Sequence, residues 1–407
     1  MTRTAAPPRF GRNLAAVLAW ELLWGFGNAC TTSPIFVPFL SRLEGSKRLV
    51  GTVGLTTLLG IPALFVSLWL AHHLRRRRLA VALLFAAQVV GWIVLGAALL
   101  AGTTFSSSIV PIIYVTQAVL AFVANVSMAP TYQLLTGVFG DRFGTAQGLQ
   151  LLGRQTTGVL GGIWAATVLE RYAFPEGFGR AFLVGGIVMT ASNVAVMFFV
   201  EPDEPTIDAP KREPFLPTLR KILTEARSVA NLAVVVATVA TAVSVQSFMV
   251  VSALERLHLG DAYAGIFASV TLAAQGIGGA LAGRIGDRVG HARTLIASLA
   301  VQFIAFALVV TLSGRSQFYV ALVLAGLTHA AMQIALAGLT TRLAPKDIRG
   351  AFMAIMRWAV TVVAALATAA AAYVVDHVGY AALYLGCLVP IVISMGIARL
   401  LARREFT

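Results

Sequence analysis

The chain has 407 residues, of which 58% are hydrophobic and only 12% are charged, and its mean hydropathy is +0.83. Soluble domains carry about 25% charged residues, so this composition excludes a soluble enzyme and indicates an integral membrane protein. The net charge of +14 would suggest nucleic acid in a soluble protein, but here we attribute it to membrane orientation and to contact with anionic lipid headgroups.

Apolar runs of about 20 residues, each long enough to cross the hydrocarbon core, divide the chain into two sets of six predicted helices. A polar, proline-rich stretch separates the two sets. We therefore expect an N-terminal six-helix bundle (1–200), a cytoplasmic linker (201–228) and a C-terminal six-helix bundle (229–407). The predicted spans are 13–40, 49–71, 79–101, 108–135, 144–169, 181–200, 230–254, 263–282, 293–312, 317–341, 350–375 and 380–400.

Most Lys and Arg residues lie in the loops that are predicted to be on the same side of the membrane as the N-terminus. Because cytoplasmic loops carry the excess of these residues, both termini and the linker are expected in the cytoplasm, in a bacterial inner membrane. Cys30 and Cys387 lie in apolar runs and are expected to be packing residues. No phosphate-binding loop, metal-ligand spacing or nucleophile motif is visible, so we expect no cofactor and no metal.

We predict that Gly283-Arg284-Ile285-Gly286-Asp287-Arg288-Val289-Gly290 is a charged turn that joins two membrane helices, with Gly283, Asp287, Arg288 and Gly290 as candidate gating residues. One interpretation is a solvated loop with positive charge. The other is a latch, in which Gly283 and Gly290 allow helix ends to approach while Asp287 and Arg288 contact neighbouring helix termini. The pattern resembles the cytoplasmic signature of the major facilitator superfamily. There it lies between helices 2 and 3 and recurs between helices 8 and 9.

The resemblance implies a secondary transporter and not an enzyme, in which two six-helix bundles related by a pseudo-two-fold axis rock about a mid-membrane site. Its implied partners are a small-molecule substrate, a proton or other coupling ion and membrane lipid, and we expect a monomer. The first-half copy of the signature, at 67–76, has lost both glycines and the aspartate. We therefore expect Asp287 to act against the start of helix 5, and Arg75–Arg78 to hold topology and bind lipid.

Glu21 is the one acidic residue inside a predicted span. A carboxylate in hydrocarbon is costly unless it is paired or protonated, so it normally faces a cavity and has a function. Glu21 is thus the candidate for proton coupling. The alternative is a structural ion pair, or a position near the cytoplasmic mouth of helix 1.

Two arginines lie in predicted spans, Arg154 in helix 5 and Arg357 in helix 11. These two helices have the same place in the two weakly repeated halves of the chain. A fixed guanidinium there would attract an organic anion or neutralise Glu21. Arg357 is also close enough to the helix end to reach the interface. Uncharged polar residues in spans could complete a binding site, although intramembrane histidines are more often packing residues than proton relays. These candidate residues are Asn28, Asn125, Gln155, Gln246, His329 and Gln333.

Helix 5 carries Gly144, Gly153, Gly158 and the pair 161–162, a spacing similar to the antiporter signature of the superfamily. Ordinary small-residue packing is the alternative. Tyr114 stands where the helix 4 signature of the superfamily begins with arginine, which argues against the usual proton mechanism.

The sequence predicts a proton-coupled exporter of a small amphiphilic or anionic organic solute. An importer or facilitator of an organic anion is the second hypothesis. The competing class is a non-transporting helical membrane protein, such as a pigment-assembly factor or a membrane-bound transferase.

Overall fold

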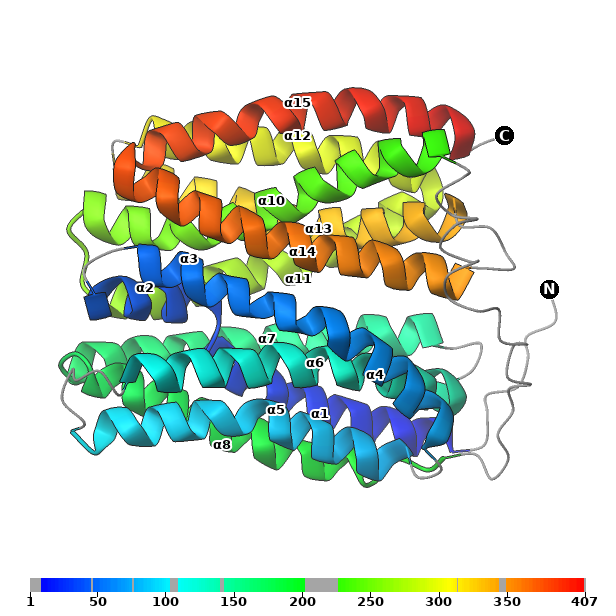
Figure 1. The fold of residues 1–407 in the computed structure, drawn as a ribbon, viewed down its shortest axis with the longest axis horizontal. Helices are drawn as coiled ribbons and strands as arrows, with labels where there is room; N and C mark the ends of the chain where they lie inside the picture. Colours follow the sequence, from blue (N-terminus) through cyan, green and yellow to red (C-terminus); the bar gives the residue numbers. More distant parts are fainter. Residues whose placement is uncertain are drawn as a thin grey trace. The chain divides into compact units, whose positions relative to one another are not determined.

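The computed structural model describes residues 9–44, 47–74, 77–102, 109–139, 143–201, 226–312, 314–343 and 349–405. Over these residues the chain forms helices and turns and contains no strand (Figure 1). In hydrocarbon every backbone N–H and C=O must be satisfied internally, which a helix achieves within one segment. The prediction of an all-α membrane fold is confirmed.

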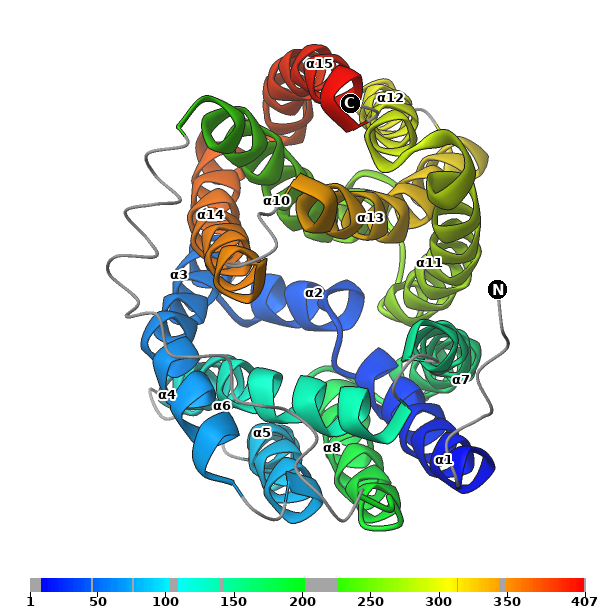
Figure 2. The same ribbon diagram turned by 90° about the vertical axis from the view of Figure 1, so that its right-hand side faces the viewer.

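The helices form two compact units, Met1–Ile35 with Thr56–Pro210, and Phe36–Leu55 with Lys211–Thr407. Figure 2 shows the helices roughly along their axes. Chain order alone would place Phe36–Leu55 in the first unit, but it packs with the second. The first unit contains α1 (Phe10–Ala29), the 3₁₀ helix η1 (Thr56–Leu59), α4 (Gly60–His73), α5 (Arg77–Leu100), α6 (Ile109–Phe139), α7 (Phe143–Arg171) and α8 (Glu176–Val196). The second contains most of α2 (Ser33–Glu44), together with α3 (Arg48–Leu55), α10 (Ala226–Arg256), α11 (Ala262–Val289), α12 (His291–Val310), α13 (Arg315–Leu343), α14 (Arg349–His377) and α15 (Tyr380–Glu405).

In the described part of the chain, 11 helical stretches are long and apolar enough to cross a membrane. α7 is not among them, since residues such as Gln150, Arg154 and Gln155 lower its hydropathy. Its 29 residues nevertheless extend about 44 Å at 1.5 Å per residue, enough to cross the hydrocarbon core. With α7 the helices correspond to the predicted spans.

The first predicted span, 13–40, is not one continuous helix. α1 ends at Ala29, and α2 begins at Ser33 after a short break. Pro34 accounts for the break, because proline has no N–H to donate and disfavours helical geometry in the residue before it. It is tolerated in the first turn of α2.

The second predicted span, 49–71, also changes geometry along its length. After α3 the chain tightens into η1 and then continues as α4. Pro62, in the first turn of α4, removes a backbone donor that a continuous helix would use, and a short 3₁₀ segment is a common way to accommodate such a loss.

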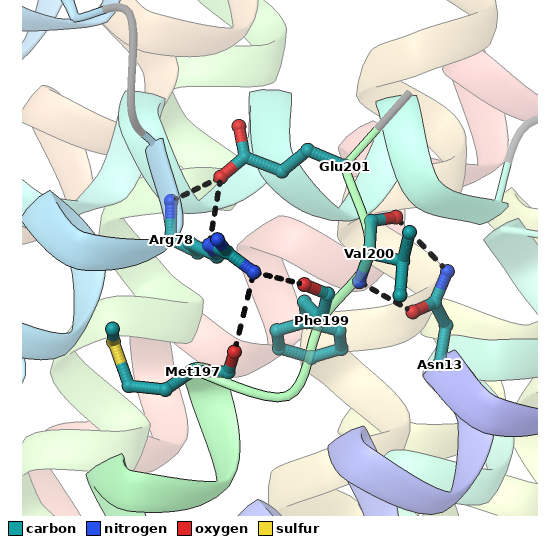
Figure 3. Close-up of polar contacts among 6 residues, drawn as sticks. All are labelled: Asn13, Arg78, Met197, Phe199, Val200 and Glu201. Carbon is teal, nitrogen blue, oxygen red and sulfur yellow. Dashed lines mark hydrogen bonds and ion pairs between the residues drawn. The ribbon is translucent and has the colours of Figure 1, made fainter. Parts of the chain in front are cut away.

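The end of α8 is held by a side chain of α1 (Figure 3). Asn13 pairs with both backbone groups of Val200: its Nδ2 donates to the Val200 carbonyl at 3.3 Å, and the Val200 N–H donates to Asn13 Oδ1 at 2.8 Å. An amide side chain thus satisfies both backbone groups of a residue that lies four positions beyond the end of α8. Asn13 is buried, which makes this pairing part of the core of the first unit.

Arg78, in the first turn of α5, completes this cap (Figure 3). Its Nη1 donates to the carbonyls of Met197 at 3.4 Å and Phe199 at 3.1 Å, and its backbone N–H donates to Glu201 Oε1 at 2.9 Å. The sequence predicted that Arg75–Arg78 would hold topology and lipid. Arg78 in addition fixes the point at which the chain leaves α8.

The stretch from Gly283 to Gly290, expected to be a turn, is helical through Val289. Only Gly290 separates α11 from α12, and its φ of 99° is a conformation that glycine adopts without strain. Gly286 leaves room for the ring of His291, because a Cβ there would lie 2.6 Å from His291 Nδ1. The expectation of a loop was therefore wrong for all but one residue of the stretch.

Candidate functional site

Glu21 and Arg154, which lie 133 positions apart in the sequence, form an ion pair inside the first unit. Arg154 Nε donates to Glu21 Oε2 at 2.5 Å, and Arg154 Nη2 donates to Oε1 at 3.0 Å. Gln150 Nε2 donates to the same Oε1 at 2.5 Å. The Glu21 side chain is 0% exposed and that of Arg154 is 36% exposed. The carboxylate of Glu21 is therefore fully buried, whereas part of its partner Arg154 is accessible.

Close contact between α1 and α7 positions this pair. A Cβ on Gly25 would lie 2.1 Å from the carbonyl oxygen of Arg154, and one on Gly161 would lie 2.3 Å from that of Phe26. The two backbones touch because neither glycine has a side chain. Glu21 is four residues before Gly25 on the same face of α1, so the contact brings its carboxylate to Arg154.

Arg154 does not belong to the exposed apolar stripe of α7. Leu152, Leu160 and Ile163 form one exposed stripe, at 56%, 56% and 53% exposure. Two residues separate Leu152 from Arg154, which is about 200° around a helix of 3.6 residues per turn. Arg154 thus lies on the opposite side of α7 from the stripe that suits lipid.

The other polar residues of the first unit that we predicted for the site form fewer hydrogen bonds than Glu21 and Arg154. Gln155 is buried, and its Oε1 has no hydrogen-bond partner among the described residues. Asn125 Nδ2 donates to the carbonyl of Ala121 at 2.8 Å, and the amide packs against Gly60 of α4. Asn28 is half-buried near the end of α1. None of the three side chains forms a hydrogen bond with the side chain of Glu21 or Arg154.

The second unit contains an uncharged chain of polar side chains drawn from α10, α12 and α13. Gln246 Nε2 donates to Gln302 Oε1 at 2.6 Å, and the hydroxyl of Thr328 also contacts that oxygen. His329 Nδ1 lies 2.9 Å from Gln246 Oε1, and Gln333 Nε2 lies 3.0 Å from His329 Nε2. The chain runs from exposed Gln333 to fully buried Gln302.

A backbone carbonyl sets the direction of this chain. The Ala325 carbonyl only accepts, so Gln246 must present its Nε2 there, at 3.2 Å, as well as to Gln302. Gln246 Oε1 then faces His329 Nδ1, which must carry a hydrogen. In a neutral ring the other nitrogen is an acceptor, and it takes the hydrogen bond from Gln333. At the inner end Gln302 Nε2 is buried and has no hydrogen-bond partner among the described residues.

Sequence reasoning missed three members of these clusters, which are Gln150, Gln302 and Thr328. Gln150 lies four residues before Arg154 and so on the same helical face, a relation that could have identified it. Gln302 and Thr328 gave no comparable signal, because neutral polar residues are common in membrane helices. Only the fold shows that they meet Gln246 and His329.

The predicted gating residues lie at the end of α11. Gly283 has open space where a Cβ would stand, and Arg288 is exposed. The side chains of Asp287 and Arg357 lie outside the described residues, as does Arg142, so the expected contact of Asp287 with the start of helix 5 remains a prediction. No three metal-binding side chains within the described ranges lie close enough to hold a metal ion.

Ion pairs in the second unit lie at helix ends. Arg42 Nη1 contacts Asp261 Oδ2 at 2.7 Å, and the Lys47 ammonium contacts Glu255. The Lys47 N–H donates to Asp376 Oδ1 at 2.9 Å. Burial raises the pKa of the Asp261 carboxyl above its usual value, and the nearby Arg42 guanidinium opposes this shift only in part. These charges hold α2 and α3 on the second unit.

Small residues reinforce the packing of α3 on α14. A Cβ on Gly51 would lie 2.8 Å from the Ala372 Cβ, and one on Gly54 would lie 2.8 Å from the Thr368 Cγ2. The helices therefore approach as closely as small side chains permit.

Residues 232–406 match the family model of the Major Facilitator Superfamily. None of the curated proteins matches the chain. Several solved transporters share its fold over nearly its whole length. A bacterial homolog to the human lysosomal transporter Spinster, in an inward-facing and unoccupied conformation, is 15% identical, with 98% of each chain covered and a TM-score of 0.70.

The nucleoside transporter NupG is 11% identical, with 97% of this chain and 98% of that chain covered and a TM-score of 0.72. The POT family transporter PepTSo is 14% identical, with the same two shares covered and a TM-score of 0.71. At these identities the likeness shows the fold. Residues 232–406 thus match the Major Facilitator Superfamily, and nearly the whole chain has the fold of these solved transporters.

Proposed function

We propose that the chain is a proton-coupled secondary transporter that exports a small amphiphilic or anionic organic solute across a bacterial inner membrane, with both termini in the cytoplasm. The observation that carries this proposal is the ion pair of Glu21 with Arg154, supported by Gln150. It is a carboxylate fully buried within a spanning helix, beside a cation that is partly accessible. An ionisable pair at such a position marks a pathway for substrate or protons more often than a purely structural contact.

The pair supplies two states for a coupling centre. With Glu21 ionised, its carboxylate holds the Nε and Nη2 atoms of Arg154. A proton on Glu21 removes the charge attraction and weakens both hydrogen bonds, since charge-assisted bonds are roughly twice as strong as neutral ones. The guanidinium then becomes free to move and to interact with a solute. Proton binding at one residue thereby changes solute affinity at the next.

Flux measurements test this function directly. Purified protein in proteoliposomes, given a panel of labelled organic acids and amphiphiles, is expected to move at least one of them in response to a pH step. Glu21→Gln is expected to remove the response. Glu176→Gln is the matched control, because Glu176 pairs with Arg180 in the same unit at a distance of 2.6 Å but is exposed. Flux that still follows the pH step in Glu21→Gln contradicts the proposal.

Uptake of an organic anion is the second candidate. It is favoured by the partial exposure of Arg154, whose Nη1 has no hydrogen-bond partner among the described residues. A guanidinium with unused N–H groups away from the lipid-facing stripe is suited to binding a carboxylate or phosphate. Vesicles of known orientation separate the two directions, since they show on which side the solute must be placed.

We assign further solute contacts to the uncharged chain of the second unit, Gln246, His329 and Gln333, with Gln302 behind them. Amides and an imidazole provide both donors and acceptors for polar groups of a solute. Asn28, Asn125, Gln155 and Arg357 stay candidates, with fewer contacts in support. Gly283, Asp287, Arg288 and Gly290 are proposed to control movement at the cytoplasmic end of α11.

A further inference from the structure

The uncharged chain of the second unit, which runs from Gln302 through Gln246 and His329 to Gln333, ends at an exposed amide. Gln333 Nε2 donates one hydrogen to His329 Nε2, at 3.0 Å. The second N–H of that amide and its Oε1 have no hydrogen-bond partner among the described residues, and the side chain is exposed. The outer end of the chain therefore offers one acceptor beside one donor, without a charge.

Gln333 does not belong to the exposed apolar stripe of α13. Val320 and Val323 mark that stripe, at 53% and 38% exposure. At about 100° per residue, Gln333 lies about 140° around the helix from Val320 and about 80° from Val323. An amide with unused hydrogen-bonding groups is costly in hydrocarbon. Its place on α13, off the stripe that suits lipid, avoids that cost.

We propose that Gln333 binds an uncharged group of the solute that both donates and accepts a hydrogen bond, of which a primary amide is the simplest, and that Gln246 and Gln302 are positioning residues that fix which groups Gln333 presents. This inference rests on the proposed function, in which the second unit supplies solute contacts. It narrows the contact to Gln333 and adds the chemistry of the group that is recognised.

The tautomer of His329 determines what Gln333 presents. With its hydrogen on Nδ1, the ring accepts at Nε2 and takes an N–H from Gln333, so that Oε1 of the amide stays free. With the hydrogen on Nε2, the amide would have to turn its Oε1 inward and would present two N–H groups outward. The first arrangement suits a group that carries a donor, whereas the second suits a carbonyl or an anion.

Gln246 fixes this tautomer because its own direction is fixed. Its Nε2 faces two acceptors, Gln302 Oε1 at 2.6 Å and the Ala325 carbonyl at 3.2 Å. Its Oε1 lies 2.9 Å from His329 Nδ1. Turning the amide by 180° would set oxygen against oxygen at both acceptors and lose both hydrogen bonds. The ring hydrogen of His329 is therefore kept on Nδ1.

Gln302 directs its oxygen toward Gln246 although its own amino group remains unpaired. The side chain is 0% exposed, and its Oε1 also contacts the hydroxyl of Thr328. Its Nε2 is buried and has no hydrogen-bond partner in the described part of the chain. Turning Gln302 would place this Nε2 against the Nε2 of Gln246. A buried group left unpaired calls for an explanation, and the direction of the uncharged chain provides one.

The chemistry of the uncharged chain favours a neutral group over an ion. A histidine that accepts at Nε2 is neutral, and the other members are amides and a hydroxyl. The hydrogen bonds that join these side chains to one another and to the Ala325 carbonyl involve no charged side chain. An ionic group bound at Gln333 would therefore find no opposite charge within the uncharged chain.

Solid-state nitrogen-15 NMR of the purified full-length protein, labelled at its six histidines, tests the tautomer without any solute. The measurement is made at about pH 8, where an unperturbed histidine is neutral. The nitrogen chemical shift separates a ring nitrogen that carries hydrogen from one that does not, and His329→Asn identifies the signals of this residue. In wild type we expect hydrogen on Nδ1 of His329 and none on Nε2.

Variants of the two positioning residues should change this spectrum. Gln246→Leu removes the acceptor for the Nδ1 hydrogen and is expected to shift a measurable part of the population to the Nε2–H form. Gln302→Leu leaves Ala325 as the acceptor for Gln246, so a smaller shift is expected. Gln317→Leu is the matched control, because Gln317 also belongs to α13 but donates to backbone carbonyls at the end of α12.

Binding of small probes tests the recognised group. Benzamide offers a donor and an acceptor, whereas N,N-dimethylbenzamide offers only an acceptor. In wild type we expect benzamide to bind about five- to tenfold more tightly, the usual contribution of one hydrogen bond. Gln333→Leu is expected to remove this preference, which separates the hydrogen bond from the bulk of the two methyl groups. Gln246→Leu should reduce the preference without contacting the probe, and Gln317→Leu should retain it.

Three results would overturn the inference: hydrogen on Nε2 of His329 in wild type, a preference for benzamide that is unchanged in folded Gln333→Leu, or no binding of benzamide by wild type. A tautomer that is unchanged in folded Gln246→Leu contradicts the positioning role. Melting temperatures show whether each variant is folded, and Gln246→Met is a second probe of that position if Gln246→Leu is unstable.

Flux after a pH step is measured in parallel in proteoliposomes, so that the two proposals fail separately. The expected tautomer and preference for benzamide, without flux that responds to pH, retain the recognition site and contradict the proposed function. Flux that responds to pH and keeps the selectivity of wild type in Gln333→Leu retains the proposed function and contradicts the recognition site.

Discussion

The two units hold their polar residues in different ways. The first unit encloses a charged pair, Glu21 with Arg154, whereas the polar chain of the second, from Gln333 to Gln302, is uncharged. A buried charge depends on its partner, because removing one member leaves the other unpaired in a low-dielectric interior. A buried neutral donor or acceptor left without a partner costs about 1–3 kcal/mol, less than a buried charge left unpaired. Substitutions should therefore have larger effects in the first unit than in the second.

The largest expected effect is that of Arg154→Ala. It leaves the fully buried Glu21 carboxylate without its cation, and the expected loss of stability is about 3 kcal/mol, at the lower end for broken buried pairs because Arg154 is partly exposed. Thermal or denaturant unfolding in detergent measures it. Arg180→Ala is the control: it breaks a partly exposed ion pair worth at most about 1 kcal/mol and a stack on the Tyr172 ring worth about 0.5–1 kcal/mol, and it leaves no buried charge.

The double variant Glu21→Gln with Arg154→Ala sharpens this result. Removing both charges should restore much of the stability that Arg154→Ala loses, because no unpaired carboxylate remains. Equal stability of the single and double variants would show that the lost packing of the arginine, and not the charge, determines the cost.

Gly25→Ala is expected to come second. Its Cβ would lie 2.1 Å from the Arg154 carbonyl, so α1 and α7 must separate and lengthen the contact between Glu21 and Arg154. Overpacking of this kind costs about 1–3 kcal/mol. Gly153→Ala on α7 is the matched control, because its Cβ would meet only Leu18 and Leu22 at ordinary distances of 3.6 Å or more. If the two variants unfold alike, the close crossing does not position the pair.

Gln246→Leu tests the second unit and should have a smaller effect. It removes the acceptor for His329 Nδ1–H and the donor to Gln302 and Ala325. The expected loss is about 1–2 kcal/mol, because no charge is left unpaired. Unfolding under the conditions used for Arg154→Ala gives the comparison. A loss as large as that of Arg154→Ala would contradict the distinction between the two units.

The smallest expected effect concerns pH and Asp261. Burial raises its folded-state pKa above the ordinary value of 3.8, so the acid form is favoured in the folded protein. This contribution to stability is fully present below the unfolded pKa and is lost as pH rises through the raised folded pKa. Asp261→Asn should therefore reduce the loss of stability over that window, as measured by melting temperature against pH. An unchanged profile would mean that Arg42 offsets the burial fully.

The sequence could identify the charged residues because charge is rare in apolar spans. Glu21 and Arg154 stand out in this way, and the number and order of the helices follow from hydropathy. The sequence raised the pairing of Glu21 with Arg154 as one of two alternatives, and it could not decide between them because the pairing depends on the contact of α1 with α7 through Gly25. Neutral polar residues gave a weaker signal, which is why Gln302 was missed although it is fully buried.

The interruptions and ends of the helices were predicted less well than their number. Pro34 and Pro62 mark the two interrupted spans, yet their hydropathy indicated continuous helices. The helical course of 283–289 was hidden by glycines and charges that usually indicate a loop. At the two prolines the local residue preference prevailed over hydropathy, whereas over 283–289 the helix continues against the preference of its glycines.

The membership of Phe36–Leu55 in the second unit affects how the protein can be divided. Cutting the polypeptide within 202–225 gives a C-terminal fragment that lacks α2 and α3. In that fragment Glu255 and Asp261 lose their basic partners, and the face of α14 at Thr368 and Ala372 loses its cover. Split-protein complementation should therefore require both fragments in the same membrane, since the N-terminal piece contains an arm that completes the other half.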